Sequence, residues 1–129
     1  MANPTIELKS RTKKFALNII RLFRSPPRAE DVRIIARQVL RSGTSVAANY
    51  RAACRARSRA EFIAKLGTVV EEADETVFWL ELLVESGMAQ QQLVAAIAKE
   101  ANELLAIFAA SQRTTRQGVK DWVTESVNH

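Results

Sequence analysis

Two long segments of helical periodicity, residues 30–57 and 58–86, follow one another with almost no linker. In the first, apolar side chains recur at three- and four-residue steps from Val32 to Tyr50, the spacing of one helix face. The second opens with "SRAE" at residues 58–61, a capping-box pattern in which Ser and Glu satisfy free backbone N–H groups at a helix start. At 1.5 Å per residue each segment is roughly 40 Å long. Helices of equal length joined this tightly predict an antiparallel hairpin.

Two further helical segments flank this hairpin. The first covers about residues 7–23 and ends before the proline pair 26–27, which cannot continue a helix. The last covers about residues 89–117, and Gly118 is expected to interrupt it. Four helices with short connections predict an all-α fold, an up-down-up-down antiparallel four-helix bundle.

A chain of 129 residues suits one domain with a single core. We expect residues 1–118 to form the four-helix bundle domain and residues 119–129 a short amphipathic or frayed C-terminal tail. The first 14 residues carry charges and no apolar run, and no apolar stretch reaches the roughly 18 residues of a membrane span. The single cysteine, Cys54, provides no disulfide framework and is expected to be a small core residue. The prediction is a cytoplasmic protein without a membrane partner.

Charge is distributed unevenly along the chain, whose net charge is +5. Residues 1–59 contain 14 Lys and Arg against 3 Asp and Glu, which gives +11, whereas residues 60–129 contain 5 against 11, which gives −6. Two interpretations stay open. The two halves can pair with each other inside the molecule, or the basic half can present a surface to a polyanion.

Arginines line one edge of the 30–57 helix when its residues are placed at 100° intervals. Arg33, Arg37, Arg41, Arg51 and Arg55 lie on this edge, Arg57 and Arg59 follow at the corner before the next helix, and Lys13, Lys14 and Arg21 of the first helix extend it. A planar guanidinium binds phosphate through two parallel hydrogen bonds. The seven arginines are therefore the candidate nucleic-acid-binding residues.

Acidic residues of the 58–86 helix offer these arginines another partner. Antiparallel pairing about the turn at residues 57 and 58 brings Glu75 level with Arg41. Salt bridges of Glu72 or Glu75 with Arg37 or Arg41 are therefore expected. Exposed pairs contribute only about 0–1 kcal/mol each, so their role would be to fix the register or a subunit contact.

A row of small residues, with Gly43 and Ala47 at its centre, runs beside the large apolar residues of the 30–57 helix. Small side chains let another backbone approach closely, and such packing offsets the roughly 1 kcal/mol of helix propensity that Gly43 loses relative to Ala. Tyr50 lies among apolar positions, so we expect it in the core rather than stacked on a base.

Three large apolar residues of the 58–86 helix, Phe78, Trp79 and Leu82, lie opposite its core face. Monomers rarely expose a contiguous aromatic patch. We therefore expect these residues, with Glu75 beside them, to form an oligomer interface. The alternative is that the tail or the first helix covers them.

Residues that catalysis would need are missing from the expected bundle. The single histidine is His129, the last residue, so no Glu-x-x-His motif of a bundle metal site is present. No Cys–His or Ser–His pair can form inside the bundle, and the sequence has no Gly-rich phosphate loop. We expect no enzymatic activity, no metal and no cofactor.

A longer pattern runs through the two central helices. It consists of Leu40, Ser42, Thr44, Ser45, Val46, Ala48 and Asn49, then Ser58, Arg59, Glu61 and Phe62, then Glu72, Glu75, Thr76, Trp79 and Leu80. Over about residues 30–85 the chain resembles the 23S rRNA intervening sequence protein family, also called four helix bundle protein. The resemblance implies a ring-shaped homopentamer of four-helix bundles with no catalytic residues. The family is similar in fold to the accessory protein of diversity-generating retroelements, a basic pentamer that binds nucleic acid and a reverse transcriptase.

These observations predict a non-enzymatic homo-oligomer that binds RNA or DNA electrostatically with little sequence selectivity. The resemblance implies that the oligomer is a pentamer. The rival prediction is an oligomeric protein–protein scaffold whose arginines form inter-subunit salt bridges.

Overall fold

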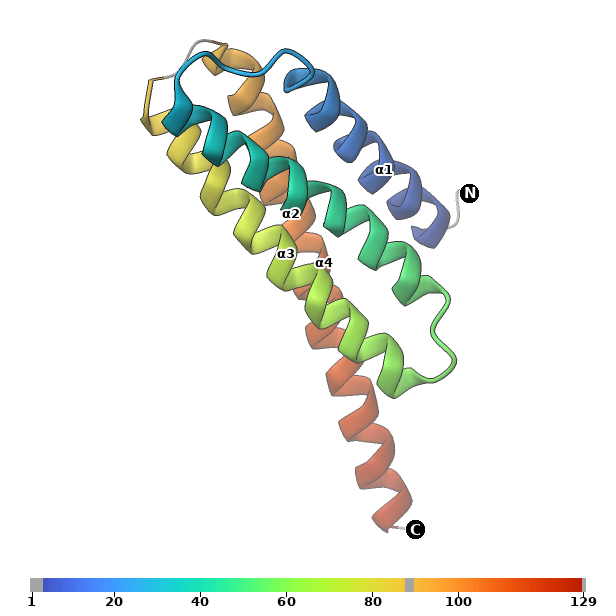
Figure 1. Ribbon diagram of the computed structural model, residues 1–129. Helices are drawn as coiled ribbons and strands as arrows, with labels where there is room; N and C mark the ends of the chain where they lie inside the picture. The colour runs from blue at the N-terminus through green and yellow to red at the C-terminus, as the bar shows by residue number, and fades with distance from the viewer. Residues whose placement is uncertain (1–3, 88–89, 129) are drawn as a thin grey trace.

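Four helices make up the described part of the chain. The structure is a computed structural model, which describes the backbone of residues 4–87 and 90–128 and the side chains of residues 7–87 and 90–118. The helices are α1 (Pro4–Leu22), α2 (Glu30–Cys54), α3 (Arg59–Glu85) and α4 (Gln91–Asn128), and no strand occurs within the described residues. Successive helices run in opposite directions and pack side by side (Figure 1). The prediction of an all-α four-helix bundle is therefore confirmed.

Helix α1 ends before the two prolines, as predicted, and a short connection leads into α2. In the first turn of α2, Asp31 Oδ1 accepts a hydrogen bond from the backbone N–H of Val32 at 2.8 Å. Arg33 Nε–H donates to the carbonyl oxygen of Pro27 at 3.1 Å. This bond ties the connection to the start of α2, where the helix dipole also favours the acidic residues.

The turn between α2 and α3 is short, although α2 ends at Cys54, three residues earlier than expected. Ser58 Oγ accepts a hydrogen bond from the N–H of Glu61 at 3.0 Å, which is the first half of the predicted capping box. The carboxylate of Glu61 accepts from the N–H of Arg57 at 3.3 Å, one residue before the usual position. Both side chains therefore satisfy backbone donors at the start of α3.

Gly87 ends α3 as expected from its position. Its φ of 73° lies in the left-handed region that favours glycine, and its N–H donates to the carbonyl oxygen of Val84 at 3.3 Å. Gln90, with φ of 69°, then turns the chain into α4, and its carbonyl accepts from the N–H groups of Leu93 and Val94. These bonds satisfy free backbone groups at both helix ends.

The core lies along the bundle axis and draws on all four helices. Its members are Phe15, Ile19, Val39, Val46, Tyr50, Leu66, Val69, Ala73, Val77, Leu80, Leu83, Val94, Ala101, Leu104 and Phe108. Tyr50 is 5% exposed and its ring centroid lies 5.0 Å from that of Phe108, which joins α2 to α4. Tyr50 is thus a core residue, as predicted.

Gly43 lies at a close approach between α1 and α2. A Cβ atom placed on it would collide with Cδ1 of Ile19 and would lie 3.7 Å from Cε2 of Phe15. Ile19 is fully buried, so its side chain fills the space that Gly43 leaves. The predicted close contact at Gly43 is confirmed, and its partner is α1.

Helix α4 is longer than expected. It runs for 38 residues, from Gln91 to Asn128, and passes Gly118 without a break, so the expected interruption there is wrong. A single glycine costs only about 1 kcal/mol in a helix and keeps helical dihedral angles without strain. The C-terminal part of α4 extends beyond the other three helices (Figure 1). The amphipathic character predicted for the tail concerns side chains outside the described residues.

Candidate functional site

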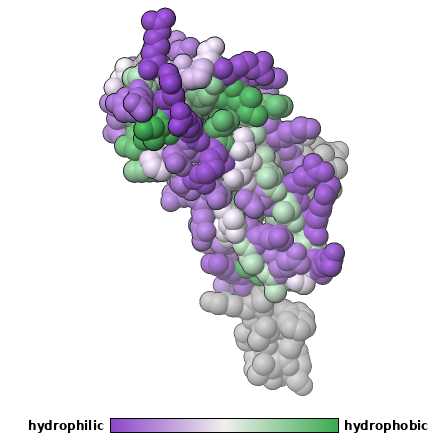
Figure 2. Space-filling model, in the orientation of Figure 1, coloured by the Kyte–Doolittle hydropathy of each residue, from purple (hydrophilic) through white to green (hydrophobic). Residues whose placement is uncertain are grey.

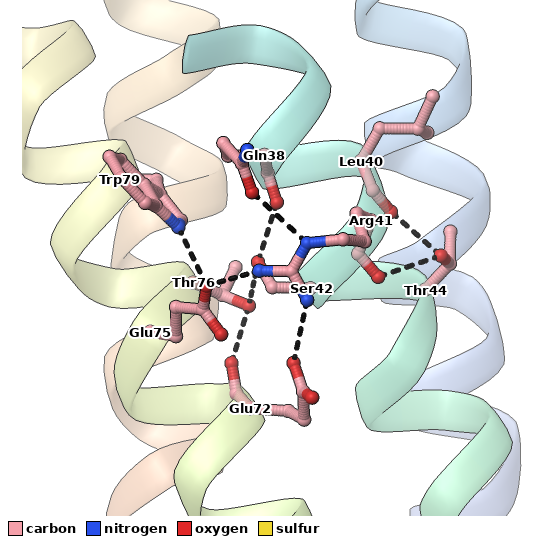
Figure 3. A network of polar contacts seen from close by, with 9 residues as sticks. All are labelled: Gln38, Leu40, Arg41, Ser42, Thr44, Glu72, Glu75, Thr76 and Trp79. Atoms are coloured by element: carbon pink, nitrogen blue, oxygen red, sulfur yellow. Dashed lines mark hydrogen bonds and ion pairs between the residues drawn. The ribbon is translucent and has the colours of Figure 1, made fainter.

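Arg41 is neutralised by two carboxylates of α3. Its Nη2 forms an ion pair with Oε1 of Glu75, and its Nη1 lies 3.6 Å from Oε2 of Glu72. Its Nε–H donates to Oε1 of Gln38 at 3.0 Å (Figure 3). Oε2 of Glu72 is buried and has no hydrogen-bond donor among the described residues, so the guanidinium of Arg41 compensates its charge. The predicted pairing between the helices is therefore formed by Arg41.

A buried pair of hydroxyl groups lies behind this ion pair. Ser42 and Thr76 are both fully buried, and their side-chain oxygens are 2.8 Å apart. Ser42 Oγ–H donates to the carbonyl oxygen of Gln38 at 2.8 Å, and Thr76 Oγ1 lies 2.7 Å from the carbonyl oxygen of Glu72 (Figure 3). The two groups satisfy each other inside the contact between α2 and α3, which makes them unavailable to a ligand.

The aromatic residues of the predicted oligomer interface continue this network toward solvent. Trp79 Nε1–H donates to Oε1 of Glu75 at 3.2 Å, and most of the indole packs on the core. The ring of Phe78 lies edge-on to that of Trp79, with centroids 5.1 Å apart, and keeps 50% of its surface exposed. Leu82 is partly buried. Phe78 is therefore the residue of this group that the bundle leaves open.

The remaining edge arginines have different surroundings. Arg33 is held by the α1–α2 connection, as described above. Arg37 and Arg59 are exposed, and neither forms an ion pair with another described residue. Of the lysine and arginine residues of α1 that extend the predicted surface, Lys14 and Arg21 line a pocket on another side of the molecule, between α1 and α4.

Arg51, Arg55 and Arg57 lie around two adjoining pockets at one end of the bundle. The pocket between α1 and α2, of about 540 Å³, is lined by Lys9, Ser10, Lys13, Thr44, Ala47, Ala48, Arg51 and Arg55. The pocket between α2 and α3, of about 450 Å³, is lined by Ala48, Arg51, Ala52, Arg55, Arg57, Glu61 and Lys65. Arg51 and Arg55 border both pockets. Three helices and the α2–α3 turn thus bring six cations together.

We call this group the cationic end. It consists of Lys9, Lys13, Arg51, Arg55, Arg57 and Lys65. The ion pairs within the described residues involve Arg11 and Arg41 and none of these six. The one carboxylate in either lining is that of Glu61, which caps α3. The charges of these six cations and one carboxylate sum to +5, which equals the net charge of the whole chain.

Sequence reasoning missed Lys9 and Lys65 as members of this site. Lys65 is the one lysine in the first half of the acidic α3, and Lys9 lies near the start of α1. The antiparallel register contains the signal, because α1 and α2 pair head to tail and α3 begins beside the end of α2. Helical periodicity places residues around one helix but does not show which residues of its neighbours lie beside them.

Arg11 serves the fold instead of this surface. Its Nε–H donates to Oε1 of Glu100 and its Nη2 to Oε2 of Glu103, both at 2.7 Å, which ties α1 to α4. The hydrogen bond with Glu100 is the largest influence that raises the pKa of Arg11 above its ordinary value. Arg11 therefore stays charged and paired.

Metal binding and membrane crossing find no support in the described residues. No group of three or more His, Cys, Asp or Glu side chains in this part of the chain could hold a metal ion. In the part of the chain that the structure describes, no helix is both long enough and apolar enough to cross a bilayer.

The fold and its charges define a four-helix bundle with a cationic end. The chain belongs to the 23S rRNA-intervening sequence protein family, which it matches over residues 5–110. It is also similar to a protein of unknown function from the S23 ribosomal protein family of Bacteroides thetaiotaomicron VPI-5482, whose crystal structure was determined at 1.70 Å resolution. The two are 34% identical, the match covers 81% of this chain and 96% of the other, and the TM-score is 0.72. No significant match occurs among the curated proteins.

The family membership inferred from the sequence pattern is thus confirmed. Residues of that pattern meet where α2 packs on α3, among them Ser42, Glu72, Glu75, Thr76 and Trp79 (Figure 3). They hold the two helices together, and Ser58 and Glu61 of the same pattern cap α3. The residues of the pattern therefore stabilise the four-helix fold. The descriptions of the family and of the similar structure name no enzymatic activity.

Proposed function

We propose that this protein is a non-enzymatic homo-oligomer that binds RNA or DNA electrostatically through its cationic end. The observation that carries the proposal is the gathering of six cations around two adjoining pockets with one carboxylate, which already caps a helix. Cations without protein partners keep their field outside the molecule, where it attracts polyanions.

The proposed surface is narrower than the arginine edge expected from the sequence. Arg51, Arg55 and Arg57 belong to it, whereas Arg41 is neutralised by α3 and Arg33 holds a connection. Arg37 and Arg59 are exposed and add to the field from outside the two pockets. Guanidinium groups suit this role because each can bind a phosphate through two charge-assisted hydrogen bonds.

A fluorescence-anisotropy titration with single- and double-stranded RNA and DNA at about 50 mM salt tests the proposal. We expect binding in the micromolar range or tighter and little dependence on base sequence, because phosphate contacts carry no sequence information. The logarithm of the affinity should fall linearly with the logarithm of the salt concentration. If none of the four nucleic acids binds at micromolar concentration, the proposal is wrong.

The second candidate function is that of an oligomeric scaffold for a protein partner. The exposed ring of Phe78 favours it, because a half-exposed aromatic residue supported by Trp79 offers an apolar contact point. In this case Arg37 and Arg59 would pair with acidic residues of another subunit. The two functions predict different results in the same titration, since a scaffold has no need to bind nucleic acid.

A further inference from the structure

We infer that the cationic end takes a single-stranded polynucleotide whose phosphodiester backbone crosses α2, from the pocket beside α1 to the pocket beside α3. This inference rests on the proposed function and adds the form of the ligand and its direction. A strand lying along the arginine edge of α2 would instead meet Arg41, whose charge α3 already neutralises. The six members of the cationic end, which form no ion pair within the described residues, are instead spread over α1, α2, α3 and the α2–α3 turn.

The two pockets have a common border that a strand can pass. Arg51 and Arg55 line both, and they lie about 6 Å apart along α2, at 1.5 Å per residue. Ala48 also lines both pockets, about one turn before Arg51, and its small side chain leaves the border low at that point. Lys9 and Lys13 then supply charge on the α1 side, and Arg57 and Lys65 supply it on the α3 side.

Duplex nucleic acid fits this surface poorly. The major groove of B-DNA, about 12 Å wide and 8.5 Å deep, accepts a helix that stands free of its neighbours. Here α2 is flanked by α1 and α3, and packed helices have axes only about 8–10 Å apart, so α2 cannot enter a groove. A duplex would touch the arginines between the pockets and leave both pockets unfilled. A flexible single strand can place phosphates in each.

The pocket linings point to backbone contacts without base recognition. Apart from the six cations and Glu61, they consist of Ala47, Ala48, Ala52, Ser10 and Thr44. No aromatic ring lines either pocket, so bases have no stacking platform of the kind that single-strand binders use. Hydrophilic side chains are prominent at this end of α1 and α2, whereas the most apolar ones in this view lie toward the opposite end, among further hydrophilic ones (Figure 2). We therefore expect affinity that depends on charge and chain flexibility.

The number of cations limits the salt dependence. Each neutralised phosphate of a single strand contributes about −0.7 to the slope of log affinity against log salt. Six cations therefore allow a slope no steeper than about −4 for one protomer on a short strand. If a phosphate contact contributes nothing at about 1 M salt, the same slope makes it worth about eightfold in affinity at 50 mM salt. Each cation removed should therefore weaken binding by about that factor.

Four double variants, each removing two positive charges, test the crossing path. They are Arg51→Gln/Arg55→Gln at the shared border, Lys9→Gln/Lys13→Gln on the α1 side, Arg57→Gln/Lys65→Gln on the α3 side, and the control Arg24→Gln/Arg28→Gln in the α1–α2 connection. Two probes are compared. One is a single strand of about 12 nucleotides, which is long enough for one site, and the other is the perfectly paired duplex of the same sequence. Circular dichroism and thermal melting establish that each variant is folded.

We expect the first three variants to lose roughly sixtyfold in affinity for the single strand and the control to stay within about twofold of the parent. The parent should bind the single strand more tightly than the duplex. Equal or tighter binding of the duplex overturns the inference and leaves the proposed function intact. A loss confined to one side of α2, or a control that loses as much as the others, also overturns it. Absence of any binding overturns both.

Discussion

Gly43 and Ile19 together determine how closely α1 approaches α2. The Ile19 side chain is fully buried, and its Cδ1 atom lies so close to the position that a Cβ atom on Gly43 would take that the two atoms would collide. An alanine at position 43 requires only that the end of Ile19 move. A larger side chain must also displace Phe15, which is 3% exposed and belongs to the core.

The variant Gly43→Leu should therefore destabilise the protein by about 1–3 kcal/mol or more, because overpacking forces side chains from their preferred rotamers. Urea unfolding followed by circular dichroism measures the change. Gly118→Leu is the matched control, since a Cβ atom on Gly118 meets nothing within 4 Å. If Gly43→Leu unfolds at the same urea concentration as the parent, the close contact between α1 and α2 does not exist.

Among the elements, α1 and α4 both contribute to the core and are also joined by ion pairs, and a pocket of about 520 Å³ opens between the two helices. The pairs of Arg11 with Glu100 and Glu103 bridge this gap, with the side chain of Arg11 31% exposed. A partly exposed arginine shared between two carboxylates forms a small network, which is worth more than an isolated surface pair.

A double-mutant cycle of Arg11→Gln and Glu100→Gln should give a coupling energy of about 0.5–1 kcal/mol. The coupling should decrease as salt is added, because screening weakens partly exposed charges. Thermal or urea unfolding of the four proteins at about 50 and 500 mM salt provides the measurement. Additive single effects at low salt would mean that the ion pair does not contribute to the association of α1 with α4.

Elements defined by local signals could be predicted from the sequence. The hairpin of α2 and α3 followed from the capping pattern at Ser58 and from helical periodicity, and both act within a few residues. The end of α4 could not be predicted in this way. Gly118 lowers helix propensity by about 1 kcal/mol, but the helix continues through it.

At the candidate site, the arginine edge likewise shows what local sequence signals can and cannot predict. Periodicity places Arg41 and Arg51 on one side of α2, yet their environments differ. Arg41 forms ion pairs with Glu72 and Glu75 of α3, whereas the α3 acid that shares a pocket with Arg51 is Glu61, which caps its helix. Which residues face each other across two helices depends on the register, and this is determined by packing along the whole bundle. Lys9 and Lys65 became part of the site only through that register.

Among the described residues, the exposed large apolar side chains lie toward one end of the bundle and the cationic end lies at the other. The cationic end lies where α1 begins and α2 ends. Leu17, Ile20, Ile34, Leu40, Phe78 and Leu93 are the exposed large apolar residues of the described chain, and all lie in the half of their helix toward the other end. Arg11 and Arg41 pair with acids inside the molecule, as the first interpretation of the uneven charge predicts, whereas the six cations of the cationic end form no ion pair within the described residues.

This separation leads to a prediction about assembly. If subunits associate through their apolar ends, the cationic ends stay accessible, and one ligand can contact several of them. Phe78 is the residue to change, since it is half exposed, whereas Trp79 packs on the core and donates a hydrogen bond to Glu75. Replacing Trp79 would disturb the fold as well as the interface.

We expect the parent protein to be an oligomer, most simply a pentamer, and Phe78→Ser to dissociate it while leaving the helix content unchanged. Truncating a large aromatic anchor at the centre of an interface typically costs 2 kcal/mol or more, about a 30-fold change in an association constant. Multi-angle light scattering at micromolar concentration measures the mass, and circular dichroism measures the helicity. Ile63→Ser, at the opposite end of α3, removes a more buried apolar side chain outside the apolar end and should keep the parent mass. A monomeric parent protein, or dissociation by both variants alike, would show that the apolar end does not hold the subunits together.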